Sequence, residues 1–432
     1  MKKIVISMDN INRKFHKKDL RNFYVLFIEV SNLQIYSQFY DITISEKIIK
    51  AIYDDLINIF GRNSVFLYNS YQIIVIREFE NKVIIDKGRR YDEQRRLAQN
   101  IINYICNRHY SLGAQNQYYK ASLTIGVGSK GLIDRDNTIS QIIRLAHFAM
   151  IKAKESKIPV LVANDELRII KQDLDTLNQE IEKGFTLDEF QPFFMPTIDP
   201  KTMKIIGCES LVRWTKDKYR IIEASKFYDI ANEKNLIEKI DERIITKTFL
   251  AYNSWMKKGL INDNFRITLN LSKTSLIKFS IQDVLDLISK YNIKAENIEF
   301  DISLENNLSK EEIDATARLK SFGFKVACDV LGSTNISLPI LSEIDVATIK
   351  FGFVSQGFAK NFDNAVKLYS ALIKVAKVLN YQVMTKGIEN YQELIFAREM
   401  DVDLVQGYYF TKPLDESNFE IFLNKYKDGY EF

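Results

Sequence analysis

The sequence predicts an α/β protein with an N-terminal α/β domain followed by a (β/α)8 barrel of the TIM type. A length of 432 residues favours two or three domains. From about residue 188 onward, seven apolar strands alternate with helices, which is the order that such a barrel requires. Before about residue 160, two neighbouring strands form a hairpin, which indicates an antiparallel or mixed sheet.

Composition limits the class of protein. Apolar residues make up 46% of the chain and charged residues 27%, values that are ordinary for a globular protein with a full core. No apolar run approaches the length of about 18 residues that a membrane helix needs, and no apolar run follows the basic N-terminus, so neither a membrane segment nor a signal peptide is expected. Cys106, Cys208 and Cys328 are far apart, which excludes a disulfide framework and favours a cytoplasmic location.

Charge and glycine content argue against two classes of partner. A net charge of +4 is close to neutral for this length, so no nucleic-acid partner is expected. The chain contains neither GxxxxGK[ST] nor GxGxxG, and only 16 glycines, so a Gly-rich nucleotide loop is disfavoured.

The N-terminal domain is expected over residues 1–160 in the order βαββαβα, with helices on one side of the sheet. Its predicted elements are strands at 23–30 and 120–128, a hairpin at 64–78 around Asn69 and Ser70, and helices at 45–60, 95–110 and 139–156. A helical connector is expected over 161–186, with Asp165 as N-cap and Gly184 near its end.

The barrel domain is expected over 187–432. Its predicted strands are 205–214, 265–272, 298–303, 325–330, 346–351, 381–386 and 404–410. Helices are predicted between them at 225–235, 240–258, 281–291, 310–321, 364–379 and 390–399.

Polar residues stand at the carboxyl ends of these strands, where barrels of this kind carry their chemistry. They are Glu209, Arg213, Asn270, Asp301, Asp329, Lys350, Lys386, Glu389, Gln406 and Gly407. Carboxylates on apolar strands are costly to bury unless they are paired or bind a cation, and an all-oxygen set favours Mg²⁺, Mn²⁺ or Ca²⁺ over Zn²⁺. The alternative for each residue is a satisfied polar group in the barrel mouth.

Residues 190–214 resemble the opening of EAL domains, which hydrolyse or bind cyclic di-GMP. The family motif Glu-x-Leu-x-Arg stands at Glu209, Leu211 and Arg213. Ser210 replaces the usual Ala. Later motifs match in order over about residues 185–428: NLS (270–272), IEFDIS (298–303), ACDVLG (327–332), TKGIE (385–389) and QGYYFTKP (406–413).

Four positions depart from the pattern of active members. The second of two adjacent Asp is Val330, and the Glu before the sixth-strand Gly is Lys386. The third-strand Glu is Asp301, and a Glu three residues later is Leu304. The first two changes shift the formal charge of the site by about +3, which should weaken divalent-metal binding by orders of magnitude.

The resemblance nevertheless implies a partly preserved ligand groove, with Arg213 on a phosphate. Its implied ligand-binding residues are Gln191, Glu209, Leu211, Arg213, Asp329, Lys386, Gln406, Gly407 and Pro413. Asn232 replaces a family Glu, which alters the groove. Catalytic remnants would be Glu209, Lys350 and Glu389; residual Mg²⁺ or Mn²⁺ ligands would be Glu209, Asn270, Asp301 and Asp329.

The first 160 residues resemble a GGDEF domain more weakly, through 26–36, 123–128 and 146–157. Glu29 stands where that family holds a metal-binding Asp. The signature position, 69–73, reads NSYQI and lacks the glycines and acids, while Phe60 and Asn63 occupy the product-inhibition motif. The resemblance implies that this half does not synthesise cyclic di-GMP.

Three functions stay open. The preferred one is a catalytically inactive GGDEF–EAL protein that acts as a cyclic di-GMP receptor and requires no cofactor. The others are a ligand-independent adaptor and a weak cyclic di-GMP phosphodiesterase. The expected partners are cyclic di-GMP and a protein, and a homodimer is left open.

Overall fold

The computed structural model describes residues 8–31, 33, 42–80, 87–111, 118–130, 138–216, 220–278, 280–302, 309–331, 346–353 and 362–430. Contacts divide the chain into two compact units, 1–176 and 177–432. The division falls inside helix α6 (Asp165–Thr186), which occupies the stretch that was predicted as a connector.

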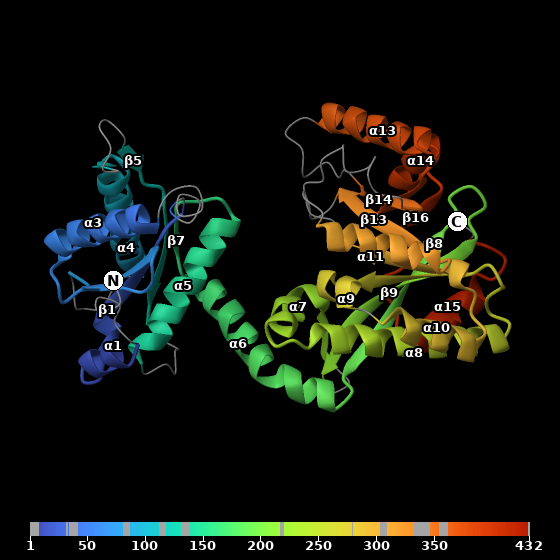
Figure 1. The fold of residues 1–432 in the computed structure, drawn as a ribbon, viewed down its shortest axis with the longest axis horizontal. Helices are drawn as coiled ribbons and strands as arrows, with labels where there is room; N and C mark the ends of the chain where they lie inside the picture. The colour runs from blue at the N-terminus through green and yellow to red at the C-terminus, as the bar shows by residue number, and fades with distance from the viewer. Residues whose placement is uncertain are drawn as a thin grey trace. The chain divides into compact units, whose positions relative to one another are not determined.

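The first unit is built on a five-stranded mixed sheet in the order β2-β3-β1-β6-β7 (Figure 1). Its strands are β1 (Phe23–Val30), β2 (Val65–Leu67), β3 (Gln72–Glu78), β6 (Leu123–Ser129) and β7 (Val160–Val162). β1 runs antiparallel to β3 and β6, whereas β7 is parallel to β6. The hairpin prediction is confirmed by β2 and β3; the short strand β7 was missed.

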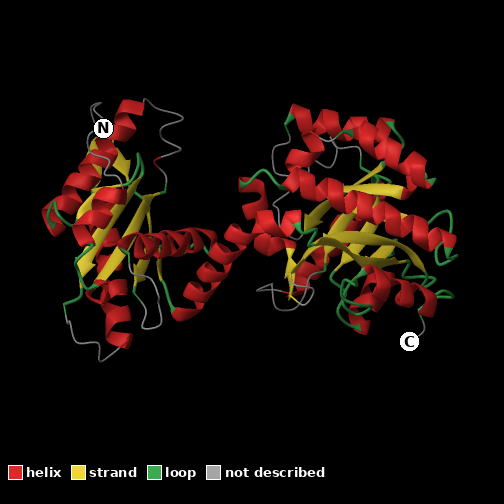
Figure 2. Ribbon diagram, turned by 90° about the horizontal axis from the view of Figure 1, so that it is seen from below, coloured by secondary structure: helices red, strands yellow, loops and turns green. Residues whose placement is uncertain are grey.

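Helices cover both faces of this sheet, so the prediction of helices on one side is wrong (Figure 2). Helices α3 (Ile42–Phe60) and α4 (Lys87–Cys106) pack on one face, and α1 (Met8–Phe15) and α5 (Ile139–Glu155) on the other. All eight residues of β1 are buried, as expected of a strand that is apolar on both faces. Gly126 allows α5 to lie against β6, since a Cβ there would sit 2.1 Å from the backbone oxygen of Ala146.

Two boundaries in the first unit also differ from prediction. α4 begins at Lys87 rather than at 95, because its first turns are charged and mostly exposed and therefore show no apolar periodicity. A small separate hairpin of β4 (His109–Ser111) and β5 (Tyr118–Lys120) was not predicted.

The second unit contains a nine-stranded sheet that closes on itself through pairing of β8 with β9. Its order is β10-β9-β11-β12-β13-β14-β15-β16-β8. The strands are β8 (Phe190–Ile198), β9 (Ile205–Lys216), β10 (Arg220–Glu223), β11 (Arg266–Leu271), β12 (Ile298–Ile302), β13 (Lys325–Leu331), β14 (Thr348–Gly352), β15 (Gln382–Lys386) and β16 (Leu404–Gln406).

The predicted eight-stranded barrel is confirmed as a closed sheet, but one of its strands is not parallel to the others. β8 is an eighth barrel strand, and it runs antiparallel to both β9 and β16. Residues 199–204 alone join β8 to β9, and such a short connection can link only antiparallel neighbours. The other six pairings around the ring, from β9 to β16, are parallel, so their carboxyl ends meet at one mouth.

Helices surround the strands, and the apolar core lies between the two layers (Figure 1). They are α7 (Ala224–Glu233), α8 (Ile237–Lys257), α9 (Lys273–Lys278), α10 (Ile281–Tyr291), α11 (Lys310–Ser321), α13 (Phe362–Val378), α14 (Tyr391–Glu399) and α15 (Glu416–Lys425). β16 ends at Gln406, four residues earlier than predicted, because the chain turns where the N–H of Phe410 donates to the oxygen of Gly407.

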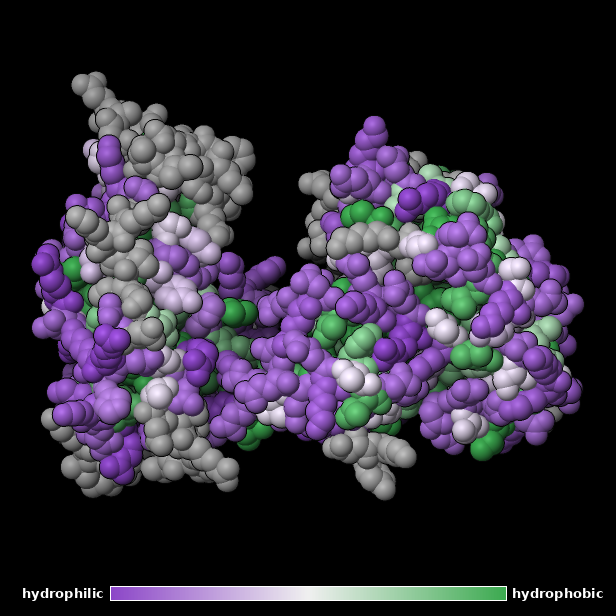
Figure 3. Space-filling model, turned by 60° about the horizontal axis from the view of Figure 1, so that its bottom comes forward, coloured by the Kyte–Doolittle hydropathy of each residue, from purple (hydrophilic) through white to green (hydrophobic). Residues whose placement is uncertain are grey.

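On the face shown in Figure 3, hydrophilic residues predominate and hydrophobic ones form small separate groups. Among the described helices, none combines the length and apolar character needed to cross a membrane.

Candidate functional site

Strand β9 directs the Glu-x-Leu-x-Arg residues to one face. Side chains alternate along a strand, so Glu209, Leu211 and Arg213 share a side. Glu209 pairs with Thr268 of β11, inside the barrel. Arg213 lies four residues farther along β9, so its backbone is about 13 Å from that of Glu209 in the direction of the mouth. The strand therefore places a carboxylate within the mouth and a guanidinium at its rim.

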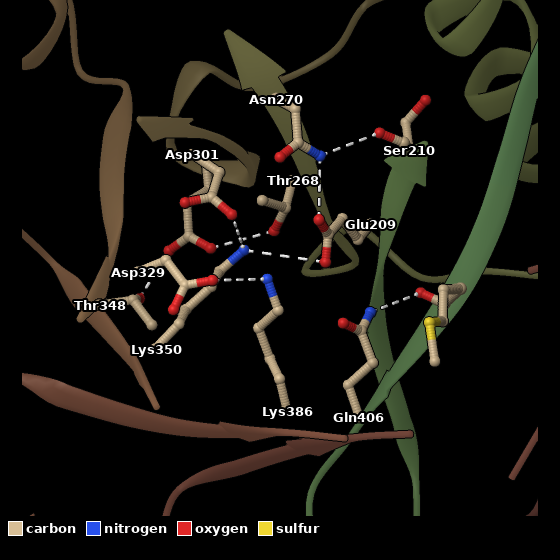
Figure 4. A network of polar contacts seen from close by, with 12 residues as sticks. Glu209, Ser210, Thr268, Asn270, Asp301, Asp329, Thr348, Lys350, Lys386 and Gln406 are labelled. Atoms are coloured by element: carbon tan, nitrogen blue, oxygen red, sulfur yellow. Dashed lines mark hydrogen bonds and ion pairs between the residues drawn. The ribbon is translucent and has the colours of Figure 1, made fainter. Parts of the chain in front are cut away.

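Seven of the predicted strand-end residues come together in one polar cluster, which we call the mouth cluster (Figure 4). Its members are Glu209, Asn270, Asp301, Asp329, Lys350, Lys386 and Gln406. They come from β9 and β11 through β16, and the register explains the convergence: Asn270 pairs with Asp301, Asp329 with Lys350, and Lys386 with Gln406.

Lys350 forms the centre of the cluster. Its side chain is fully buried, and its Nζ lies 2.6 Å from Asp301 Oδ2 and 3.9 Å from Glu209 Oε2. Burial lowers the pKa of Lys350, but the carboxylates of Asp301 and Glu209 outweigh it and raise the pKa above its usual value. Lys350 is therefore an ammonium group that holds two buried carboxylates.

Glu209 is held as an anion from several sides. Asn270 Nδ2 donates to its Oε1 at 2.9 Å, and the side chain of Gln406, whose Nε2 donates to the backbone oxygen of Met195 at 3.3 Å, also lowers the pKa of Glu209. Burial alone would raise the pKa of Glu209, but the ammonium groups of Lys350 and Lys386 lower it to about 2. A carboxylate with these partners is ionised throughout the physiological range.

Lys386 enters the same cluster from β15. Its Nζ donates to Asp329 Oδ2 at 3.1 Å, and both side chains are about one quarter exposed. Burial lowers the pKa of Lys386, whereas the carboxylates of Glu209, Asp301 and Asp329 raise it to a value well above normal. Asp329 Oδ1 is buried, and none of the residues that the structure describes donates a hydrogen bond to it.

The cluster does not fit a pair of divalent cations. Three carboxylates face two ammonium groups, which leaves a formal excess of only one negative charge. In the described part of the chain, no group of three or more His, Cys, Asp or Glu side chains is close enough to share a metal ion. Lys386 and Lys350 occupy the positions between the carboxylates instead.

Several predicted ligand residues lie apart from the mouth cluster. Gln191 pairs with Arg213 across β8 and β9, but its Nε2 donates to the oxygen of Asp188 at 2.6 Å, and it lines an open hollow of about 450 Å³ with Lys247. Glu389 is exposed, with its backbone N–H bonded to Glu393. Gln191 therefore lies next to Arg213 rather than in the mouth cluster, and Glu389 is not part of that cluster.

Other positions have different roles or fall outside the description. A Cβ at Gly407 would lie 2.0 Å from the backbone oxygen of Ile388, so close packing alone explains this glycine. Asn232 is exposed on α7, and Leu211 and Pro413 are half-buried. Leu304 lies outside the described residues, as does the side chain of Val330.

Sequence reasoning missed Asp241 on α8, because nothing in its local pattern connects it to the mouth. Ser275 Oγ donates to Asp241 Oδ2 at 2.5 Å, and the N–H of Ser272 approaches the same oxygen at 3.4 Å. Ser272 follows Asn270 by two residues, so Asp241 anchors the segment that leaves the mouth cluster. Burial raises the pKa of Asp241 to about 6, although hydrogen bonds from Ser275 and Ser272 oppose the shift.

This shift predicts a specific pH dependence of stability. The pKa of Asp241 in the folded state lies above the usual value of 3.8, so its contribution to stability is fully present below about pH 4 and is lost as pH rises through about 6. Relative to Asp241→Asn, the native chain should lose up to about 3 kcal/mol of unfolding free energy between pH 4 and 7. Urea unfolding across that range measures the difference, with exposed Asp229→Asn as control; parallel profiles for native chain and Asp241→Asn would contradict it.

The first unit contains a smaller polar cluster around Glu29, on β1. Glu29 is 5% exposed, and its two oxygens accept from Lys154 Nζ at 2.6 Å and from Gln72 Nε2 at 2.9 Å. Asn69 Nδ2 in turn donates to Gln72 Oε1 at 2.7 Å. The hairpin of residues 69–73 is thus tied to Glu29 by side chains of the unit itself.

A family model described as the EAL domain matches residues 178–413. Among curated relatives, the biofilm architecture maintenance protein MbaA of Vibrio cholerae is 21% identical over 94% of this chain and 51% of its own. The cyclic di-GMP phosphodiesterase NbdA of Pseudomonas aeruginosa is 24% identical over 58% of this chain and 32% of its own. The chain spans between about a third and a half of the length of such relatives.

A solved structure shares the fold. The EAL enzyme Bd1971, in a form bound to cAMP and cyclic di-GMP, matches with a TM-score of 0.52 and 21% identity, covering 71% of this chain and 84% of that one.

Proposed function

The chain belongs to the EAL domain family of cyclic di-GMP signalling, and from that premise we propose that it binds cyclic di-GMP without hydrolysing it. The observation that carries this proposal is the contact between Lys386 Nζ and Asp329 Oδ2 inside the mouth cluster. A positive side chain occupies a region where hydrolysis would need additional positive metal ions.

Hydrolysis of a phosphodiester by paired metals depends on both cations, which position and deprotonate water and neutralise the developing charge. An ammonium about 4 Å from a metal opposes its binding by on the order of 4 kcal/mol per unit of metal charge at an effective dielectric of about 20. The replacement residues Val330 and Leu304 act in the same direction, since each removes a carboxylate that active members carry.

Ligand binding depends on a different part of the mouth. Arg213 is half-buried at the rim, and its Nη1 donates to the backbone oxygen of Val212 at 3.0 Å. A guanidinium in this state can form charge-assisted, often bidentate hydrogen bonds with a phosphate. Support for a receptor therefore comes from a retained phosphate-binding side chain beside a cluster that is ill suited to metals.

Two alternatives make different predictions. An adaptor that has lost the ligand would bind a protein partner equally well with and without cyclic di-GMP. A weak phosphodiesterase would need one metal ion at Glu209, Asn270, Asp301 and Asp329, and its ligand binding would be sensitive to EDTA.

For the first unit, we propose a GGDEF-like domain without cyclase activity that passes the ligand-bound state to a protein partner or to a second copy of the chain. The contacts of Glu29 with Gln72 and Lys154 support the absence of cyclase activity, because the family's metal position is already neutralised. Incubation with GTP and Mg²⁺ should yield no cyclic product.

Calorimetry with cyclic di-GMP in EDTA and in Mg²⁺, with chromatography of the same samples, tests the main proposal. We expect saturable heat in both buffers and no linear dinucleotide. Absence of heat in both buffers would favour the adaptor, and Mg²⁺- or Mn²⁺-dependent formation of the linear product would overturn the assignment.

A further inference from the structure

We propose that the first unit carries a docking surface for the anionic face of a membrane. The surface is formed by the end of α1 and the turn that follows it, and we call it the basic surface. Its members are the exposed residues Arg13, Lys14, Lys17 and Lys18. The proposal goes beyond the proposed function, because it concerns where the chain is held and not what its barrel binds.

The apolar side of α1 fixes the basic surface on the unit. Ile11 and Phe15 are 2% and 8% exposed, and both belong to an apolar cluster that includes residues of β1 and α5 (Figure 1). A helix turns by about 100° per residue, so Arg13 points away from the side that Ile11 and Phe15 bury. Asn12 Oδ1 accepts a hydrogen bond from Ser140 Oγ at 2.6 Å, which ties α1 to the start of α5.

Neighbouring acids do not neutralise the basic surface. Among the described residues, no carboxylate forms an ion pair with any of its four members. Asp19 follows directly in the sequence, but Arg21 engages it, with Nε and Nη2 each 2.9 Å from a carboxylate oxygen. Lys14 Nζ donates to the backbone oxygen of Asn63 at 2.8 Å and lies 5.2 Å from the centre of the Phe66 ring, contacts that keep its charge. The charge of the basic surface is therefore available to an external anion.

The shape of the basic surface favours an extended anion over a single enclosed phosphate. It borders an open hollow of about 720 Å³. The lining residues all come from one short segment: Asn12, Arg13, Lys14, His16, Lys17 and Lys18. A site for one phosphate needs donors that converge on it, such as backbone N–H groups or a guanidinium fork. Lysine side chains from one segment are flexible point charges instead, and they suit an array of phosphates.

Membranes and nucleic acids both present such arrays, and the side chains favour the membrane. Proteins that bind single-stranded nucleic acid combine cations with exposed aromatic rings that stack on the bases. The described residues 10–22 expose no Phe, Tyr, Trp or large aliphatic side chain, since Ile11, Phe15 and Leu20 are buried. Clusters of four to eight Lys or Arg are typical of surfaces that bind anionic lipid headgroups. Because the apolar side chains of this segment are buried, the contact is electrostatic and lies at the headgroups.

Sedimentation of the full chain with lipid vesicles tests the proposal. At about 0.15 M salt, the native chain should bind vesicles of phosphatidylglycerol and phosphatidylcholine in equal parts. About 1 M salt should release it, because the distance over which a charge acts falls from about 8 Å to about 3 Å. Vesicles of phosphatidylcholine alone should not bind the chain.

A triple variant identifies the residues. Arg13→Gln, Lys17→Gln and Lys18→Gln together should lower the partition onto anionic vesicles by about 100-fold, or about fivefold for each charge removed. Lys14 stays in place because it bonds to Asn63. The matched control neutralises three exposed lysines on α7 and α8: Lys226→Gln, Lys239→Gln and Lys257→Gln. The control has the same net charge as the triple variant, yet it should bind like the native chain, and both variants should keep the native Tm.

Three results would overturn the membrane proposal: no binding of the native chain to anionic vesicles, equal binding by the native chain and the triple variant, or an equal loss in the triple variant and the control. Tighter binding of a DNA duplex than of anionic vesicles at the same salt concentration would overturn it in favour of a nucleic acid. Saturable binding of inorganic triphosphate that the triple variant loses would overturn it in favour of a phosphate site. Cyclic di-GMP is absent from all of these measurements, so they stand even if the proposed function fails.

Discussion

Lys350→Met should lower the free energy of unfolding by about 3–5 kcal/mol, the cost expected when one partner of a buried ion pair is removed. Lys350 is fully buried, and it neutralises Asp301 at 2.6 Å and Glu209 at 3.9 Å. Met preserves most of the volume, so the loss would report on charge rather than on a cavity. Both carboxylates would remain in a barrel interior where water cannot replace the ammonium.

Urea unfolding of native chain, Lys350→Met and Lys377→Met measures this effect. Lys377 and Asp403 form a partly exposed pair, and such pairs contribute about 0–1 kcal/mol. Adding Asp301→Asn to Lys350→Met should recover part of the loss, because it removes the nearer unpaired charge. A loss below about 1 kcal/mol for Lys350→Met would show that the cluster is far more hydrated than the contacts indicate.

Arg213→Ala should weaken binding of cyclic di-GMP by about 30- to 1000-fold, or roughly 2–4 kcal/mol. The guanidinium is at the rim of the mouth, on the same strand face as Glu209, and its removal should change affinity more than stability because the side chain is only half-buried. Lys386→Ala should weaken binding by a smaller factor, since Asp329 already compensates the charge of Lys386.

Calorimetry in EDTA compares native chain and Arg213→Ala, with Arg318→Ala as control. Arg318 is exposed on the outer helix α11 and should leave affinity unchanged. If Arg213→Ala binds within threefold of the native chain, the ligand does not use this arginine, and the groove implied by the Glu-x-Leu-x-Arg motif is wrong.

The difference between predicted and observed site residues has a clear physical origin. Asn270, Asp301 and Lys350 could be grouped from sequence because the carboxyl ends of parallel strands meet at one mouth, whatever the details of packing. The resemblance places Gln191 in the ligand groove with Arg213, and the two residues pair across β8 and β9. The amide of Gln191 nevertheless donates to the backbone oxygen of Asp188, whose carboxylate contacts Lys247, and these contacts come from the fold and not from the motif. The resemblance assigns Gly407 to the ligand-binding residues. The structure gives a second reason for a glycine there, because a Cβ at this position would collide with the backbone oxygen of Ile388.

Three features could be predicted from the amino-acid sequence: the strand–helix alternation of the second unit, the hairpin of the first, and the polar residues that face the barrel mouth. These features follow from periodicities of two and 3.6 residues and from strand direction, which are local properties of the chain. Three others became visible only in the folded chain: β8 closes the barrel antiparallel, helices cover both faces of the first sheet, and Lys386 contacts Asp329. These features depend on which distant segments of the chain meet and on how their buried charges balance. Neither can be predicted from a short window of neighbouring residues.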